Sequence, residues 1–288
     1  MNSVFFDYAA IDHWINEDAA LLDLTSHILD VGSSDATIDF VIRHDGIAAC
    51  TEEVQRIIQH CGAQSSNCIP SGTIVKAGDI LVSGAGPAHA LLRAWKVGQN
   101  LLEYACGVAT LCGDMKAIIN SHDSKIALLT TRKHAPGLRG IALKATLSAG
   151  ALPHRLSLSE TILIFPQHIA LLGGWEALKA KIQVKKSGFT EKKIVIEANN
   201  LDQAYRAIEA GADVLQFDKA TPEQLQEWLP QLRKNWPHGL FLAAGGISLK
   251  NVARYAQTSV DGIVTSALHY ASPADIGVNI QPVKTEAN

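Results

Sequence analysis

The sequence lacks the features of a disulfide-stabilised, zinc-binding or membrane-spanning protein. It has five cysteines among 288 residues, an odd number, with no Cys-x-x-Cys pair; we therefore expect neither a disulfide framework nor a structural zinc site. Its apolar runs are far shorter than a membrane span requires. The first ten residues include Asp7 and no basic residue, which is unlike a signal peptide. We expect a cytoplasmic protein with no membrane partner.

Charge is sparse and nearly balanced. Charged residues make up 18% of the chain, and the net charge is −3 at pH 7, so the balance does not indicate nucleic acid or a membrane surface as a partner. Hydrophobic residues make up 47%, enough for a sizeable core. The length suits one large domain or a barrel with a smaller partner domain.

The first part of the chain mixes short helices and strands. The pattern predicts a helix over 51–60 with Thr51 as its N-cap. Pro87 predicts the start of a long helix that ends near residue 119. Gly98 and Gly107 are expected to interrupt that helix.

The remainder alternates short apolar runs with amphipathic helical patterns. Runs that are apolar on both faces and alternate with helices predict a parallel sheet. Six such units fit an open, incomplete TIM-like α/β barrel better than an eight-unit barrel, and an open doubly wound sheet is the alternative. The runs span residues 126–129, 162–165, 194–196, 214–217, 240–243 and 262–264.

Polar residues or glycines follow five of these six runs. In a parallel barrel the residues just past the carboxyl ends of the strands face the active site. Ordinary solvated loop starts would also be polar, but five at the same end of successive strands favour a site. The segments are 130–133, Glu197, 218–219, 244–246 and 265–266.

These residue types suggest an anion-binding site. Arg132, Lys133, His154 and Arg155 would concentrate positive charge, and arginine can bind a carboxylate or phosphate with two parallel hydrogen bonds.

Acidic residues and glycines in the same site indicate that it also binds a metal ion and a phosphate. Glu197 and Asp218, two acids in a basic pocket, suggest Mg²⁺ held together with a substrate phosphate. Gly245 and Gly246, read as opening a helix, would offer backbone N–H groups to a phosphate. The set predicts a phosphorylated, magnesium-bound sugar and an anionic acceptor as ligands.

Blocks around these residues resemble the quinolinate phosphoribosyltransferase family. The resemblance runs in order over nearly the whole chain, which is more specific than one motif. It is greatest to the ModD branch, a group associated with molybdenum transport. The blocks are Asp23-Leu24-Thr25, Gly86-Pro87-Ala88, residues 106–110, Thr131-Arg132-Lys133, Pro136-Gly137, Pro153-His154-Arg155-Leu156, Gln167-His168, Glu197 with Asn200-Leu201, Ala212-Asp213 with Asp218, Gly245-Gly246-Ile247 and Ala267-Leu268.

The resemblance implies a fold and a reaction. It implies an N-terminal α/β sandwich over residues 1–110, to which the tail 272–288 returns, and an open α/β barrel over 111–271. Two chains would form a homodimer in which one chain completes the active site of the other. The family transfers ribose 5-phosphate from phosphoribosyl pyrophosphate to the ring nitrogen of quinolinate, and carbon dioxide is then lost.

The resemblance also implies a role for each site residue. It divides them into acceptor-binding, catalytic and phosphate-binding groups. These are Arg132, His154 and Arg155 for the acceptor carboxylates; Lys133, Glu197 and Asp218 for phosphoribosyl pyrophosphate, with Glu197 and Asp218 as Mg²⁺ ligands; and Gly245, Gly246 and Ser266 for the 5-phosphate.

Three departures from the family pattern concern substrate binding. Trp95-Lys96 stands where the family has Glu-Arg. In the family that arginine reaches the acceptor site of the partner chain, and lysine keeps the charge but lacks the planar, forked guanidinium group. Phe165 replaces a substrate-binding lysine, and Ser266 replaces a phosphate-site glycine. Loss of a cation favours a different acceptor. The alternative is that Phe165 points into the core and a neighbour supplies the charge.

Three hypotheses follow for the function. The leading one is a phosphoribosyltransferase whose small-molecule acceptor is a nitrogen heterocycle other than quinolinate. The second is an authentic quinolinate phosphoribosyltransferase of NAD biosynthesis that tolerates the substitutions. The third is a non-catalytic protein that binds an anion or nucleotide and is linked to molybdenum transport. The acidic pair Glu197 and Asp218 argues against the third, because a pure binder would not need it.

Overall fold

The computed structural model describes residues 4–283. The chain separates into two compact units. Unit 1 contains the described chain up to Gly113, residues 134–150 and the chain from His269, whereas unit 2 contains residues 114–133 and 151–268. Residues 134–150, which lie within the range expected for the barrel, therefore cluster with unit 1.

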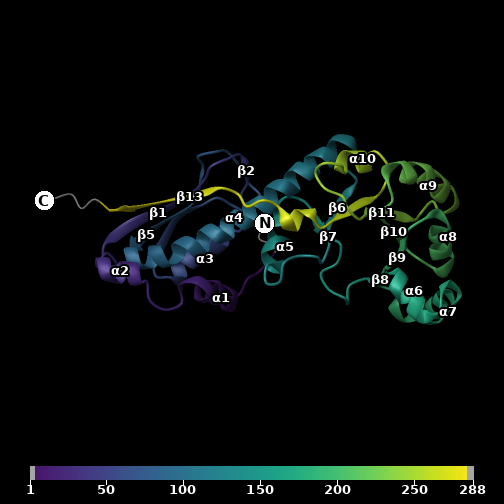
Figure 1. Cartoon of the computed structure of the whole chain (residues 1–288), viewed down its shortest axis with the longest axis horizontal. Coiled ribbons are helices and arrows are strands. Elements are labelled where there is room, and N and C mark those ends of the chain that lie inside the picture. Colours follow the sequence, from purple (N-terminus) through teal and green to yellow (C-terminus); the bar gives the residue numbers. More distant parts are fainter. Residues whose placement is uncertain (1–3, 284–288) are drawn as a thin grey trace. The chain divides into compact units, whose positions relative to one another are not determined.

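Unit 1 contains a four-stranded antiparallel sheet in the order β13-β1-β5-β3 (Figure 1). Alternate residues of β1, from Ala36 to Ile42, are buried, as expected for a strand with one face on the core. The last strand, β13, pairs with β1, so the described part of the tail does join this sheet, and residues 284–288 lie outside the described chain. The strands are β1 (Asp35–Ile42), β3 (Gln64–Cys68), β5 (Ile80–Pro87) and β13 (Ile276–Pro282), with the short pair β2 (Gly46–Ile47) and β4 (Ile74–Val75) beside them.

The helices of unit 1 correct two expectations. Helix α3 (Thr51–His60) has Cys50, not Thr51, as its N-cap, and Cys50 adopts a left-handed φ of 58°. Helix α4 (Ala88–His122) is continuous through Gly98 and Gly107, and it extends beyond Gly113, where this stretch of unit 1 ends. A Cβ on Gly98 would lie 3.0 Å from the Phe40 ring, and one on Gly107 would lie 2.3 Å from the backbone oxygen of Ser272. These glycines permit close packing rather than breaking the helix. The remaining α-helices of unit 1 are α1 (Tyr8–Ala19), α2 (Leu24–Leu29) and α5 (Arg139–Ser148).

Unit 2 contains a seven-stranded, wholly parallel sheet in the order β7-β6-β12-β11-β10-β9-β8. The expected six strands are present, and β7, only two residues long, is the seventh. The open α/β barrel with a separate N-terminal sheet domain is confirmed. The strands are β6 (Ala127–Thr130), β7 (Leu152–Pro153), β8 (Ile162–Ile164), β9 (Ile194–Ala198), β10 (Val214–Asp218), β11 (Leu240–Ala244) and β12 (Gly262–Thr265).

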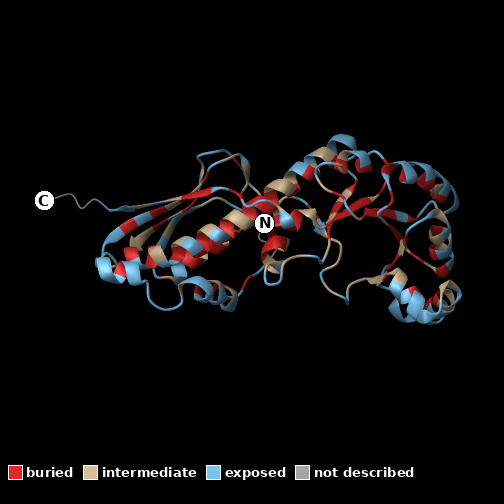
Figure 2. Cartoon of the chain, in the orientation of Figure 1, coloured by how far each residue is buried: buried red, intermediate tan, exposed pale blue. Residues whose placement is uncertain are grey.

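Helices surround the strands of unit 2, and each α-helix has exposed residues on one face and buried residues on another (Figure 2). They are α6 (Pro166–Leu172), which was not expected, α7 (Trp175–Lys185), α8 (Leu201–Ala210), α9 (Pro222–Asn235) and α10 (Val252–Ala256), besides the 3₁₀ helices at Lys186–Phe189 and Ala267–Tyr270. An apolar cluster that includes Val195, Val214 and Leu242 fills the inner side of the strands.

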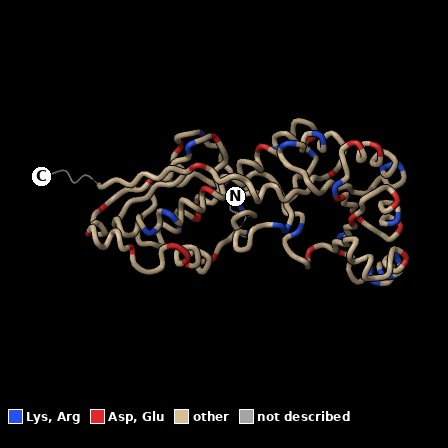
Figure 3. The backbone as a smooth tube through the Cα atoms, in the orientation of Figure 1, with Lys and Arg blue, Asp and Glu red and all other residues tan. Residues whose placement is uncertain are grey.

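Basic and acidic residues are interspersed along the described chain (Figure 3). Among the described residues no helix is both long enough and apolar enough to cross a membrane.

Candidate active site

A pocket of about 530 Å³ lies within unit 2 at the carboxyl ends of the parallel strands. Its position is the one that a parallel α/β barrel uses for catalysis. The site residues predicted from the sequence gather here, apart from Lys96: Arg132, Lys133, His154, Arg155, Phe165, Glu197, Asp218, Gly245, Gly246 and Ser266 all line it. Lys96 lines a different cavity, of about 770 Å³, within unit 1.

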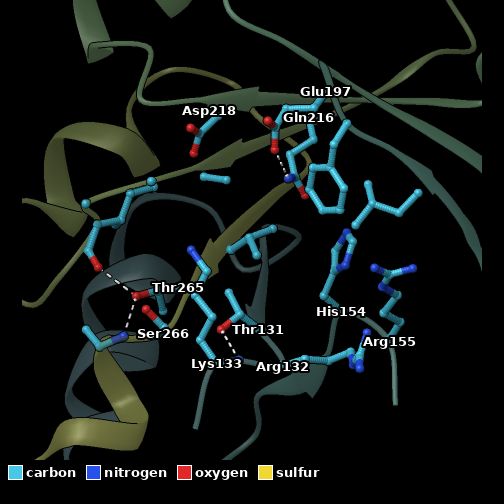
Figure 4. Close-up of a pocket in the computed structure, with 18 of the residues that line it drawn as sticks. Thr131, Arg132, Lys133, His154, Arg155, Glu197, Gln216, Asp218, Thr265 and Ser266 are labelled. Carbon is cyan, nitrogen blue, oxygen red and sulfur yellow. Dashed lines mark hydrogen bonds between the residues drawn. The ribbon is translucent and has the colours of Figure 1, made fainter. Parts of the chain in front are cut away.

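The strand register brings the acidic side chains together. Gln216 of β10 pairs with Glu197 of β9, and Asp218 at the end of β10 pairs with Ala244 of β11. Because side chains alternate between the faces of a strand, Gln216 and Asp218 point to the same face of β10. In Figure 4, Glu197, Gln216 and Asp218 lie at one side of the pocket, and the side chain of Lys133 extends toward them from the other side, where Arg132 also lies.

Glu197 is held in an environment that disfavours its charge. Burial raises its pKa, and the nearby negative charge of Asp218 raises it further. The side-chain Nε2 of Gln216 donates a hydrogen bond of 3.0 Å to Glu197 Oε2, and this bond and the charge of Lys133 act in the opposite direction.

The two acids are suited to a cation shared with a substrate. A divalent cation would relieve the repulsion between Glu197 and Asp218, and Mg²⁺ commonly binds one or two carboxylates together with substrate phosphates. Within residues 4–283 no group of three or more His, Cys, Asp or Glu side chains could hold a metal by itself. A Mg²⁺ ion held by this pair would need further oxygen ligands, which a substrate phosphate could supply.

The basic side chains occupy the opposite side of the pocket. His154 directly follows β7, and its backbone N–H donates to the Thr130 oxygen at 2.9 Å. Burial and the charge of Arg155 lower the pKa of His154, which favours a neutral imidazole. Burial, followed by the charge of Arg132, lowers the pKa of Arg155. The repulsion between these two arginines would be relieved by a bound anion.

The loop after β11 is shaped by backbone conformations that favour glycine. Gly245 and Gly246 have φ angles of 86° and 72°. A Cβ on Gly245 would lie 2.6 Å from Asp218 Oδ1, whereas one on Gly246 would meet nothing within 4 Å. Helix α10 begins only at Val252 and has five residues, so the expectation that the two glycines open a helix is wrong. Any phosphate at this position would contact loop N–H groups instead.

Two side chains support this loop, and no individual role was predicted for either of them from the sequence. Thr265 Oγ1 donates to the Ile247 oxygen at 2.6 Å and accepts from the Ala267 N–H at 3.0 Å. Asn251 Nδ2 donates to the Gly246 oxygen at 3.1 Å. Thr265 thereby joins the loop after β11 to the segment that contains Ser266, another residue lining the pocket.

From the sequence, Phe165 was expected either to line an altered acceptor pocket or to point into the core, and His134, beside Lys133, either to contact phosphate or to be an ordinary loop residue. Phe165 is half-buried and lines the pocket, so it does not point into the core. Its ring stacks against the ring of His168, with centroids 5.7 Å apart, and its N–H donates to His168 Nδ1 at 3.0 Å. His134 belongs to unit 1, where its ring lies 5.9 Å from that of His269.

Gln216, like Ser248, is a pocket residue that was not predicted from the sequence. It is only 6% exposed, and its Oε1 has no hydrogen-bond partner among the described residues. A single polar residue within the apolar run 214–217 was the available signal, because a polar side chain on an inward-facing position is informative.

Comparisons with known proteins match this architecture. The families described as "Quinolinate phosphoribosyl transferase, N-terminal domain" and "C-terminal domain" match residues 23–106 and 108–279. "Putative pyrophosphorylase ModD" of Escherichia coli O157:H7 is 34% identical over 279 residues, covering 97% of this chain and 98% of that protein. The ModD protein of Rhodobacter capsulatus is 36% identical over 247 residues, covering 86% and 95%.

More distant relatives share the fold. The carboxylating nicotinate-nucleotide pyrophosphorylase of Rattus norvegicus is 28% identical over 270 residues, covering 92% of this chain and 88% of that protein. The crystal structure of NadC from Streptococcus pyogenes has a TM-score of 0.86 at 22% identity, with 96% of this chain and 97% of that chain covered.

Proposed function

Because this chain belongs to the quinolinate phosphoribosyltransferase family, we propose that it is an enzyme that transfers ribose 5-phosphate from phosphoribosyl pyrophosphate to a nitrogen-heterocyclic acceptor and releases pyrophosphate. The observation that carries the proposal is the composition of one pocket. An acidic pair, a basic cluster and a glycine loop line the same cavity of unit 2. Each matches one part of that reaction.

In this reaction the bond between ribose C1 and the pyrophosphate oxygen breaks, and its electron pair leaves with pyrophosphate. The lone pair of the acceptor nitrogen forms the new bond to C1. Positive charge develops on the ribose and is stabilised by the carboxylates of Glu197 and Asp218, while Lys133 offsets negative charge on the phosphates. Glu197 and Asp218 would also hold Mg²⁺, which when bound would offset the negative charge of the leaving pyrophosphate.

The acceptor is proposed to differ from quinolinate. Arg132, His154 and Arg155 line the pocket and suit an anionic group. Phe165 provides an aromatic wall where the family has a lysine. Two adjacent carboxylates, as in quinolinate, need more positive charge than this arrangement offers. The second candidate is quinolinate itself, which the named activity of the rat relative favours.

We further propose a homodimer in which Lys96 of one chain contributes to the site of the other. Lys96 lies over the Trp95 ring at 4.7 Å, donates to Gln99 Oε1 at 3.0 Å and lines the cavity of unit 1. Large apolar side chains are exposed around the same cavity, including Leu21 and Leu22. An exposed apolar patch of this kind is typical of a protein interface.

The test is stabilisation by the donor substrate. Mg²⁺ with phosphoribosyl pyrophosphate should raise the melting temperature, because a ligand that binds only the native state stabilises it by mass action. Glu197→Gln and Asp218→Asn should lose most of that increase. Glu227→Gln, an exposed position on α9, should keep it. No increase for the unmodified protein at saturating ligand would contradict the proposal.

A further inference from the structure

Gln216 lines the pocket and has a buried amide oxygen without a hydrogen-bond partner. It lies in the middle of β10, lines the cavity and is 6% exposed. Its Nε2 donates to Glu197 Oε2 at 3.0 Å, but its Oε1 has no partner within the described chain. A buried amide oxygen without a partner is unfavourable, so a ligand that pairs with it would gain affinity.

The orientation of this amide follows from its neighbour. Gln216 Nε2, on the NH₂ side of the amide, donates to Glu197 Oε2, so Glu197 does not use the oxygen side of that amide. Oε1 is thereby left as the free end. A ligand atom that pairs with Oε1 must be a donor, either N–H or O–H.

The surroundings of Gln216 favour a flat ligand. Ile164, the last residue of β8, pairs with Ile196 of β9. Phe165 follows Ile164 and Glu197 follows Ile196, and Glu197 in turn pairs with Gln216 of β10. Phe165 also lines the pocket, and an aromatic ring packs well against another planar ring. Arg132 and Arg155, on the other side of the pocket, remain available to bind one anionic group of the ligand.

We propose that Gln216 is a specificity residue that selects acceptors with an N–H donor beside the reacting ring nitrogen. The proposal rests on the phosphoribosyltransferase function and narrows its acceptor class. The acceptor is a planar nitrogen heterocycle that carries an amino group or ring N–H for Gln216 Oε1 and at most one carboxylate for Arg132 and Arg155. Quinolinate, with a second carboxylate in place of a donor, does not belong to this class.

Three pyridine probes test this class. All share the ring and the 3-carboxylate and differ only at position 2: 2-aminonicotinate has a donor, 2-methylnicotinate has an apolar group of similar size, and quinolinate has a carboxylate. Dissociation constants would be measured by calorimetry for the full chain and for Gln216→Leu. Gln231→Leu is the matched control, because Gln231 is exposed on α9.

The unmodified protein should bind 2-aminonicotinate at least about fivefold more tightly than 2-methylnicotinate, as one recovered hydrogen bond would give. Gln216→Leu should abolish this preference, and Gln231→Leu should keep it. Equal affinity for the two compounds, binding of neither, or a preference that persists in Gln216→Leu overturns the proposal.

The same variants separate this proposal from the proposed function. Melting temperatures with Mg²⁺ and phosphoribosyl pyrophosphate would be measured in parallel. If Gln216→Leu loses that stabilisation but keeps the amino preference, Gln216 binds the ribose hydroxyls and the proposal is overturned. If the unmodified protein shows the amino preference without donor-substrate stabilisation, the phosphoribosyltransferase function fails while the assignment of Gln216 as a recognition residue stands.

Discussion

At position 165 a single side chain decides how much positive charge the pocket offers to an acceptor. Phe165 lines the same cavity as the basic side chains. An anion that is transferred into such a site without a charge partner loses affinity. The identity of this residue therefore bears directly on whether quinolinate is a substrate.

We predict that the unmodified protein turns over quinolinate poorly and that Phe165→Lys improves kcat/KM by about tenfold or more, since each ~1.4 kcal/mol of transition-state stabilisation is tenfold in rate. Adding Lys96→Arg should increase the gain if the two chains share a site. Phe189→Lys, at an exposed position, is the charge-matched control. Efficient quinolinate turnover by the unmodified protein would restore the second candidate.

Gly245 and Gly246 allow a second comparison between single residues. Gly245→Ala would place a Cβ 2.6 Å from Asp218 Oδ1, whereas Gly246→Ala would meet nothing within 4 Å. Both residues have positive φ, so both variants carry backbone strain of about 1 kcal/mol. Gly245→Ala should in addition displace Asp218 and remove most of the stabilisation by Mg²⁺ and phosphoribosyl pyrophosphate. Calorimetric unfolding with and without these ligands measures both effects, and equal behaviour of the two variants would contradict the prediction.

At the scale of elements, a buried ion pair joins α5 to α3 within unit 1. Lys144 Nζ contacts the carboxylate of Glu53, and both side chains are almost fully buried, with 2% and 1% exposed. Lys144 also lies 2.9 Å from Glu52 Oε2. Burial opposes ionisation of Glu52, but hydrogen bonds from Ser71 and Lys144 outweigh it and lower its pKa to about 2. The charged state of the cluster therefore depends on Lys144.

We predict that Lys144→Met lowers the free energy of unfolding by about 3–5 kcal/mol, because removal of one partner leaves a buried charge uncompensated. Adding Glu53→Gln should recover part of the loss. Denaturant titrations of both variants provide the measurement. Lys179→Met, which removes an exposed ion pair with Glu209, should change stability by less than about 1 kcal/mol. A similarly small effect of Lys144→Met would show that the buried pair is dispensable.

At the scale of the whole molecule, the proposed homodimer depends on apolar side chains that one chain leaves exposed. Leu22 lines the cavity of unit 1 and is 66% exposed. Ile28 follows His27, another residue that lines this cavity, and is 70% exposed. Paired chains would bury this surface in both copies, as a two-fold interface requires.

We predict that sedimentation at micromolar concentration finds a dimer and that Leu22→Asp with Ile28→Asp converts it to a monomer. Leu171→Asp, at an 87% exposed position on α6, should leave the dimer intact. A monomeric unmodified protein would contradict the proposed sharing of the site.

The sequence by itself determined the class of fold and most of the pocket. Apolar runs alternate with amphipathic helices because buried parallel strands and the helices that cover them impose these two periods. Because the carboxyl ends of parallel strands meet at one edge, polar residues after each run were expected to converge, and Glu197, Asp218 and Gly245 line one cavity.

Other features depended on contacts between segments far apart in the chain. Gly98 and Gly107 resemble helix breakers locally, yet packing against Phe40 and Ser272 retains them inside a continuous helix. Gln216 is inconspicuous within an apolar run, and only the structure shows that its amide nitrogen pairs with Glu197 while its amide oxygen has no partner among the described residues. Local periodicity reports which face of an element is buried. Which side chain meets which partner is decided by strand register and packing, and these exist only in the tertiary structure.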